Sequence, residues 1–434
     1  MIKRLLILLE AIMRFYSKPY YGFIQGHAYI KNIDLFNLRL LVCQKNYNIV
    51  NDYESKFAKL IGEGDAVSYA AARMGFYELL KILNISNGDE VILLGSTCSV
   101  MVNAILKVGA KPIYSDLDTS TFGSDASSIE KCISSRTKII VAQHSFGIPC
   151  DILQIVQLTK RKNIFLLEDC ALTLGSTVNG IMVGNFGDAA LFSTDHSKPI
   201  NTIIGGLIYS RDANLINRLR RSHEFIKELS NSKERALWDR FLLERKYFNP
   251  NNYGKMELIN LFLNIKKRFF KVEEAFLYGD HGTFSTLDYP YPAKLPTFLA
   301  AIGLYELKRW PQISLERKKL LVNLMVVADK CNFDKFIPIA YKDLTKEIVP
   351  LRFVWWHDEG AAIRKSFQKF VQIDWTWFME PIIARNESLE NLGYLNGACP
   401  LSEKIGPNMV NLPCNISFKE SVELIKLLMN TIDV

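Results

Sequence analysis

Two segments decide the fold: NIFLLEDC at residues 163–170 and DAALFSTDHSK at residues 188–198. Each is a short apolar run that ends in polar residues, a pattern typical of a buried strand whose carboxyl end reaches the edge of a sheet. Helical periodicity predicts helices in SYAAARMGFYELLKILNIS (68–86) and VMVNAILKVG (100–109). Three further runs are strand-like: VILLGS (91–96), KPIYSDLD (111–118) and KIIVAQHS (138–145). The alternation predicts an α/β fold with a mainly parallel sheet and ligand chemistry at the carboxyl ends of its strands.

The polar residues at these strand ends form a candidate site. Asp169 ends an apolar strand, where a buried carboxylate is costly unless a cation meets it. Lys198 follows the next strand, just past Ser193, and a desolvated lysine can bond covalently to a carbonyl carbon because its pKa is lowered. Pyridoxal phosphate carries a pyridinium nitrogen, an aldehyde and a phosphate, which would use Asp169, Lys198 and Ser193. A solvated lysine and a structural aspartate are the alternative interpretation of the same residues.

The composition indicates a globular protein. The 434 residues are 49% hydrophobic and 23% charged, enough for the cores of two or three domains. The eight cysteines are scattered, with no CxxC pair and no zinc-finger spacing, so we predict neither a metal site nor a disulfide framework. Reduced thiols in turn favour a cytoplasmic location.

The first 18 residues, MIKRLLILLEAIMRFYSK, are not expected to be a signal peptide. Glu10 and Arg14 interrupt an apolar run that is shorter than the roughly 20 residues needed to cross a bilayer, and no small-residue cleavage site follows. The spacing predicts a helix that packs on the protein body, with a membrane-surface helix as the alternative. Its apolar face would comprise Leu5, Leu6, Leu9 and Ile12.

Positive charge is concentrated in one part of the chain. The net charge is +8, and between Arg211 and Lys271 there are 15 Lys and Arg against 7 Asp and Glu, an excess of eight. We call residues 211–282 the basic block. It lacks the interleaved aromatic and basic residues of an RNA-binding module, so we expect no nucleic-acid partner and a solvated helical face instead.

Several segments resemble, in order, the DegT/DnrJ/StrS family of sugar aminotransferases, which are fold type I enzymes that use pyridoxal phosphate. The resemblance covers residues 52–430 except for the basic block. It rests on DYESKFAKLIG, NGDEVILLGSTCSVMVNAILKVGAKPIYSDLD, SSRTKIIVAQHSFGIPCD, FLLEDCALTLGS, VGNFGDAALFSTDHSKPINTIIGG, TFLAAIGLYEL and GACPLSEKIGPNMVNLP. It implies that Lys198 bonds to the cofactor aldehyde, Asp169 pairs with the pyridinium nitrogen and Ser193 binds the phosphate.

Several cofactor-binding positions depart from the residues usual in that family. Ala71, Ala72 and Arg73 stand where relatives have a Ser-Gly-Thr turn that opens the phosphate-binding helix. Backbone amides at a helix N-terminus still bind an anion, and Arg73 would either add a charge-assisted bond or point to solvent. Cys98 replaces an aromatic ring that stacks on the cofactor, and Leu172 replaces a glutamine or histidine that reaches its phenolic oxygen. Stacking and electronic tuning of the cofactor therefore differ from the family pattern.

Other residues near the motifs have open roles. His144 matches a family histidine beside the cofactor pocket, with a structural hydrogen-bond donor as the alternative. Asp195 and His196 flank Lys198 and are candidates for proton transfer. We expect core or subunit contacts for the tryptophans Trp355, Trp356, Trp375 and Trp377.

The resemblance implies an activity and an organisation. We expect an amino group to move from an amino acid, glutamate in the first instance, to a nucleotide-linked keto-sugar for cell-surface polysaccharide, in a cytoplasmic homodimer. We expect an N-terminal arm (1–51), a large cofactor domain (52–312) that carries the basic block as an insertion, and a small α+β domain (313–434). The basic block would lie on an anionic membrane surface, at the inner face of the membrane, or form a helical hairpin over the active site or dimer partner. A pyridoxal-phosphate-dependent sugar dehydratase or lyase, and a non-catalytic membrane-surface protein on the same fold, are the alternative functions.

Overall fold

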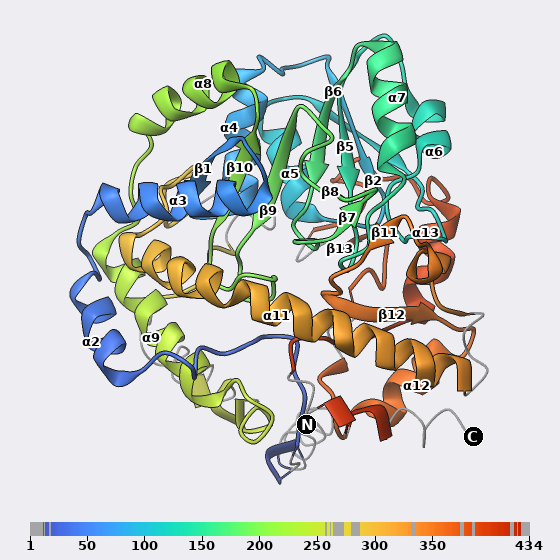
Figure 1. The fold of residues 1–434 in the computed structure, drawn as a ribbon. Helices are drawn as coiled ribbons and strands as arrows, with labels where there is room; N and C mark the ends of the chain where they lie inside the picture. The colour runs from blue at the N-terminus through green and yellow to red at the C-terminus, as the bar shows by residue number, and fades with distance from the viewer. Residues whose placement is uncertain are drawn as a thin grey trace.

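The computed structural model describes most of the chain. Figure 1 shows a large sheet with helices on both faces above a smaller unit, which we call the C-terminal unit and which comprises the described residues between 336 and 426. The described residues are 12, 14–16, 19–256, 258–260, 262–263, 273–278, 287–330, 336–373, 377–383, 387–416, 421–422 and 424–426. Leu5, Leu6 and Leu9 of the expected N-terminal helix lie outside them, and Ile12 is exposed.

The large sheet has seven strands in the order β1-β10-β9-β6-β5-β2-β4. The five strands β9, β6, β5, β2 and β4 run parallel to one another, whereas β10 pairs antiparallel with both β9 and β1. The prediction of a mainly parallel α/β sheet is therefore confirmed. The strands are β1 (Asp65–Tyr69), β2 (Glu90–Leu94), β4 (Lys111–Ser115), β5 (Thr137–Gln143), β6 (Phe165–Asp169), β9 (Ala189–Ser193) and β10 (Gly206–Ser210).

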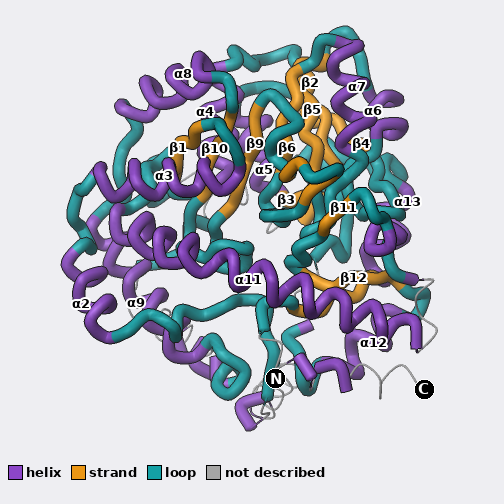
Figure 2. Tube along the Cα trace, viewed as in Figure 1, coloured by secondary structure: helices purple, strands orange, loops and turns teal. Residues whose placement is uncertain are grey.

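The remaining elements form the helical layers and three small sheets, which Figure 2 separates by colour. The helices are α2 (Asn32–Leu40), α3 (Tyr47–Ile61), α4 (Ala72–Ile82), α5 (Ser99–Lys107), α6 (Ala126–Cys132), α7 (Ile152–Lys162), α8 (Ala213–Glu224), α9 (Asn231–Tyr247), α11 (Thr297–Lys330), α12 (Gly360–Phe367) and α13 (Pro400–Ile405). The short strands pair as β3 (Thr97–Cys98) with β13 (Ile382–Ile383), β12 (Arg352–Trp356) with β14 (Met409–Pro413), and β7 (Thr177–Val178) with both β8 (Ile181–Met182) and β11 (Lys346–Glu347).

Successive side chains of the parallel strands are buried on opposite faces of the sheet. Ile92, Ile140 and Leu166 pack in a core shared with α6 and α7. Their chain neighbours pack on the other face with α4 and α5: Val91, Leu93, Ile139, Val141 and Leu167. Burial on both faces explains why these strands are almost continuously apolar in the sequence.

The helix expected over residues 68–86 starts later than predicted. Ser68 and Tyr69 belong to β1 and pair with β10, and the helix begins at Ala72. Helical periodicity did not reveal this boundary, because a short buried strand followed at once by an amphipathic helix is apolar throughout.

Helix α11 joins the large core to the C-terminal core. Phe298 and Trp310 pack in the first core, whereas Leu320 and Leu324 pack in the second, beside β12 and β14. The expected boundary at residue 313 falls inside α11, and the one at residue 51 falls inside α3. The first and second expected parts therefore share α3, and the second and third share α11. The division into domains stays a proposal.

The described part of the basic block packs on the protein. Helix α8 contacts β1, β10 and α4, and α9 lies near the start of α11, where the Trp238 and Phe298 ring centroids are 6.1 Å apart. Both helices bury apolar side chains: Leu215, Ile216, Leu219, Leu237, Trp238 and Phe241. Among the helices that the structure describes, none combines the length and apolar character needed to span a bilayer. The seven described cysteines are free, and Cys331 lies outside the described residues.

Candidate active site

A cavity of about 960 Å³ opens between the carboxyl ends of the large sheet, the C-terminal unit and the basic block. The large sheet contributes the ends of β6 and β9, and the block contributes α9 and residues 273–278. All six residues predicted to bind the cofactor line this one cavity: Ala72, Arg73, Cys98, Asp169, Ser193 and Lys198.

Lys198 lies on the loop that follows β9. Its backbone N–H donates to Asp195 O at 2.9 Å, which closes a turn, and its Nζ lies 4.8 Å from the ring centroid of Trp377. Burial lowers the pKa of Lys198, and Arg352 lowers it further, whereas the charges of Asp195, Cys98 and Asp169 oppose this shift. A larger share of neutral amine follows, which is the form that attacks a carbonyl carbon.

Asp169 ends β6 and is almost fully buried. Its Oδ1 accepts a hydrogen bond from Ala171 N at 2.9 Å, and its Oδ2 accepts none from the residues that the structure describes. Burial raises the pKa of Asp169, while the Ala171 N–H and the charge of Lys198 oppose the rise. A cationic N–H group in the cavity would satisfy Oδ2 and stabilise the carboxylate.

Helix α4 begins at the cavity wall. Its N-cap, Ala71, has no side chain to bind the first amides of the helix. A Cβ at Gly206, where β10 begins, would lie 2.5 Å from both the Cβ and the N of Ala72. Glycine at position 206 and alanine at position 72 thus let the antiparallel strand pass close beside the helix start, next to Ser193 at the end of β9. Helix N-termini of this kind bind phosphate groups.

Arg73 and Cys98 tie the cavity wall to other parts of the chain. The Arg73 guanidinium donates through Nη2 to Leu277 O, so this side chain connects α4 to the basic block. Cys98 precedes α5, and its strand, β3, pairs with β13 of the C-terminal unit.

Four cavity residues that were not predicted as site residues come from the C-terminal unit: Arg352, Gln372, Trp377 and Phe378. Trp377, expected to make core or subunit contacts, lines the cavity over Lys198. Arg352 lies 5.6 Å from the same ring and 4.1 Å from the ring of Phe23. Leu172 adds a buried apolar wall. Nothing local in the sequence links Trp377 or Arg352 to Lys198, because over 150 residues separate them.

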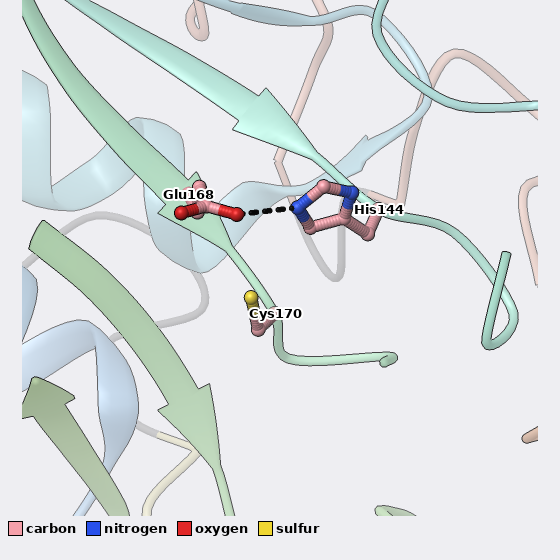
Figure 3. A group of neighbouring side chains, drawn as sticks. All are labelled: His144, Glu168 and Cys170. Carbon is pink, nitrogen blue, oxygen red and sulfur yellow. Dashed lines mark hydrogen bonds and ion pairs between the residues drawn. The ribbon is translucent and has the colours of Figure 1, made fainter. Parts of the chain in front are cut away.

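His144 forms a buried group with Glu168 and Cys170 that does not line the cavity, and Figure 3 shows His144 and Glu168 pointing toward each other. His144 Nδ1 accepts from Cys150 N at 3.0 Å, so Nε2 carries the proton and donates to Glu168 Oε2 at 3.1 Å. Burial raises the pKa of the Cys170 thiol to about 12, which keeps it protonated. Because both histidine nitrogens have partners, we assign this group a structural role.

The residues present fit pyridoxal phosphate. The cavity holds an amine with a lowered pKa, a buried carboxylate whose Oδ2 is available, and an uncapped helix N-terminus beside a serine hydroxyl. Its volume is also large enough for a substrate in addition to a cofactor.

Comparison with known proteins finds a family match over part of the chain. Residues 42–246 match the model of the DegT/DnrJ/EryC1/StrS aminotransferase family. The matched segment includes α8 and α9 up to residue 246, whereas we expected an insertion from residue 211. The chain is 40% identical over 171 residues to GDP-perosamine synthase of Escherichia coli O157:H7, covering 39% of this chain and 47% of that protein. It is 31% identical over 214 residues to the spore coat polysaccharide biosynthesis protein SpsC of Bacillus subtilis, covering 49% and 54%. The chain thus spans about half the length of these curated relatives.

The fold resembles solved structures over nearly the whole chain. NtdA of Bacillus subtilis, solved with bound cofactor PMP, superposes with a TM-score of 0.69 at 18% identity, over 94% of this chain and 84% of that one. The fold is therefore that of the fold type I aminotransferases.

Proposed function

We propose that this protein is a pyridoxal-phosphate-dependent aminotransferase that transfers an amino group from an amino acid to a nucleotide-linked keto-sugar in cell-surface polysaccharide synthesis. The observation that carries the proposal is the meeting of Lys198, Asp169 and the start of α4 in one cavity. The family match and the similarity to GDP-perosamine synthase and to a spore coat polysaccharide biosynthesis protein support the substrate class.

Pyridoxal phosphate, when bound, supplies an electron sink that stabilises negative charge on the amino-bearing carbon. Lys198 Nζ would hold the cofactor at its aldehyde, and its amine would carry the proton that the reaction moves between carbon atoms. Asp169 Oδ2 would accept the ring N–H, and the first amides of α4 with Ser193 Oγ would hold the phosphate. Leu172 and Trp377 keep water from the reacting atoms. Glutamate is the first amino donor to test.

The organisation of the protein in the cell is also a proposal. We place it in the cytoplasm, where free thiols such as the seven described here stay reduced. The resemblance implies a homodimer. For the basic block we favour a cover over the active site, because Leu237, Trp238 and Phe241 pack inward and α9 lines the cavity. Sedimentation with anionic liposomes at low salt would instead support contact with the inner face of the membrane.

The test begins with the purified protein and added pyridoxal phosphate. We expect a visible absorption band that borohydride fixes covalently at Lys198 and that Lys198→Ala abolishes. Product analysis with glutamate and nucleotide-linked keto-sugars should then show an amino sugar. Loss of water without amino transfer would point to a dehydratase or lyase, and absence of the band in the wild-type protein would overturn the proposal.

A further inference from the structure

One buried carboxylate connects the basic block to the loop that carries Lys198. Glu244 lies near the end of α9, and its side chain is fully buried. Its Oε1 lies 3.1 Å from His196 Nδ1 and accepts from Arg240 Nε at 2.7 Å, and its Oε2 accepts from Asn201 Nδ2 at 3.1 Å. We propose that Glu244 is a positioning residue that holds the Lys198 loop through His196 and Asn201. The proposal rests on the role of Lys198 in the proposed function.

The two residues that Glu244 holds lie on either side of the lysine. His196 is two residues before Lys198, and its backbone N–H donates to Ile203 O at 3.1 Å. Asn201 is three residues after Lys198, and its Oδ1 accepts from Ile203 N at 2.8 Å. The loop is therefore closed on itself at Ile203 and held from α9 by Glu244. Without that carboxylate, His196 and Asn201 would both lose their contact with α9, and Asn201 would keep its contacts with Gln25 O and His27 Nε2, each at 2.9 Å.

The charges at this contact determine how the histidine is oriented. Burial would raise the pKa of Glu244, but Arg240, His196 and His27 together lower it to about 2, so the group is a carboxylate at neutral pH. A carboxylate only accepts hydrogen bonds, so His196 Nδ1 must carry the proton. His196 Nε2 then faces Asp195 Oδ1 at 3.7 Å.

Asp195 connects the oriented His196 ring to Lys198. Its carbonyl oxygen accepts the Lys198 N–H, and its carboxylate is the strongest of the charges that raise the pKa of Lys198 against burial. A chain of contacts thus runs from Glu244 through His196 and Asp195 to Lys198.

The basic block also shields this contact from water. The Phe276 ring centroid lies 4.5 Å from that of His196, and the Arg240 guanidinium lies 4.9 Å from the same phenylalanine ring and 5.0 Å from that of Phe248. Only 12% of the His196 side chain is exposed. In this environment an ion pair is stronger than at the surface, and loss of one partner is costly.

The helix that carries Glu244 offers a matched control. Glu234 is also buried on α9, but its Oε2 accepts from Cys43 N at 2.8 Å, in the segment between α2 and α3. Glu244→Gln, Glu244→Ala and Glu234→Gln should be compared with the wild-type protein without added cofactor. Hydrogen exchange of residues 194–205 and the pH profile of Lys198 labelling by an amine reagent are the readouts.

We expect the Glu244 variants to raise exchange of the loop amides by about 10- to 100-fold, the effect of losing a charge-assisted hydrogen bond in a local opening equilibrium. The pH midpoint for labelling of Lys198 should rise toward that of an ordinary lysine, because a released loop is better solvated. Glu234→Gln should change neither. If Glu244→Ala does not fold, Glu244→Gln and Asn201→Ala carry the test.

The inference would be overturned if hydrogen exchange of the loop and labelling of Lys198 were the same in the Glu244 variants as in the Glu234→Gln control. These readouts need no cofactor, so they stand whether or not the protein binds pyridoxal phosphate. Failure of the positioning role is therefore distinguishable from failure of the proposed function.

Discussion

Replacement of Gly206 tests whether β10 sets the position of the helix start that would bind the cofactor phosphate. The Cβ of Gly206→Ala would lie 2.4 Å from the Cα of Ala72, against 3.4 Å for ordinary contact, so α4 must move by about 1.0 Å. Overpacking of this kind lowers the free energy of unfolding by about 1–3 kcal/mol. Loss of one charge-assisted hydrogen bond to the phosphate would cost about 1.5–3 kcal/mol, or roughly 10- to 100-fold in affinity.

Thermal unfolding and a titration with pyridoxal phosphate measure the two effects separately. Gly180→Ala is the control, because Gly180 has a φ of +78° in the turn between β7 and β8 and no atom lies within 4 Å of its added Cβ. That variant should lose stability through backbone strain alone and keep its cofactor affinity. Wild-type affinity in Gly206→Ala, or an equal loss of affinity in both variants, would refute the reasoning.

Three further predictions concern buried charges. Asp169→Asn should leave cofactor binding largely intact and lower turnover by orders of magnitude in a steady-state assay, because a neutral amide does not stabilise a pyridinium N–H; unchanged turnover would contradict this. Lys198→Met should raise the urea midpoint of the cofactor-free protein at pH 7. Folding lowers the pKa of this lysine below its ordinary 10.5, so burial of the charged lysine costs folding free energy, and this cost is largest below the folded pKa. Lys198→Met removes the cost, so the gain in stability should shrink as pH rises toward 10.5. A gain independent of pH would indicate packing alone. Glu168→Gln should lower the free energy of unfolding by about 3 kcal/mol, because the new NH₂ group would meet backbone amides that now donate to the carboxylate: those of Gly184, Phe186 and Gly187. A cost below about 1 kcal/mol in urea unfolding would show that the network relaxes.

The pattern of strand ends in the sequence pointed to three residues that the fold brings into one cavity. Asp169, Ser193 and Lys198 lie at or just beyond the carboxyl ends of β6 and β9, where a parallel sheet brings polar residues together. Local pattern also located the strands themselves, because their burial on both faces leaves a continuous apolar run. The family resemblance added Ala72 and Cys98, which lie in the same cavity.

The contributions of distant segments could not be predicted in the same way. Trp377 reaches Lys198 only because α11 places the C-terminal unit below the sheet, and no periodicity encodes that placement. Glu244 was counted as one charge of a solvated basic face, although its side chain is fully buried. His144 matched a residue beside the family pocket, yet its ring points to Glu168, away from the cavity. In each case tertiary packing, not local spacing, decides what the side chain contacts.

The continuity of α11 has a consequence for how the protein unfolds. Pro311 lacks an N–H and so removes one backbone hydrogen bond, but the helix still runs from Thr297 to Lys330 through both cores. Melting either core would strip packing from half of a helix whose other half depends on it, so the two units should lose structure in a single cooperative transition. A chain cut at residue 312 would divide this helix and expose the apolar faces of both fragments, so neither piece is expected to behave as an autonomous folding unit.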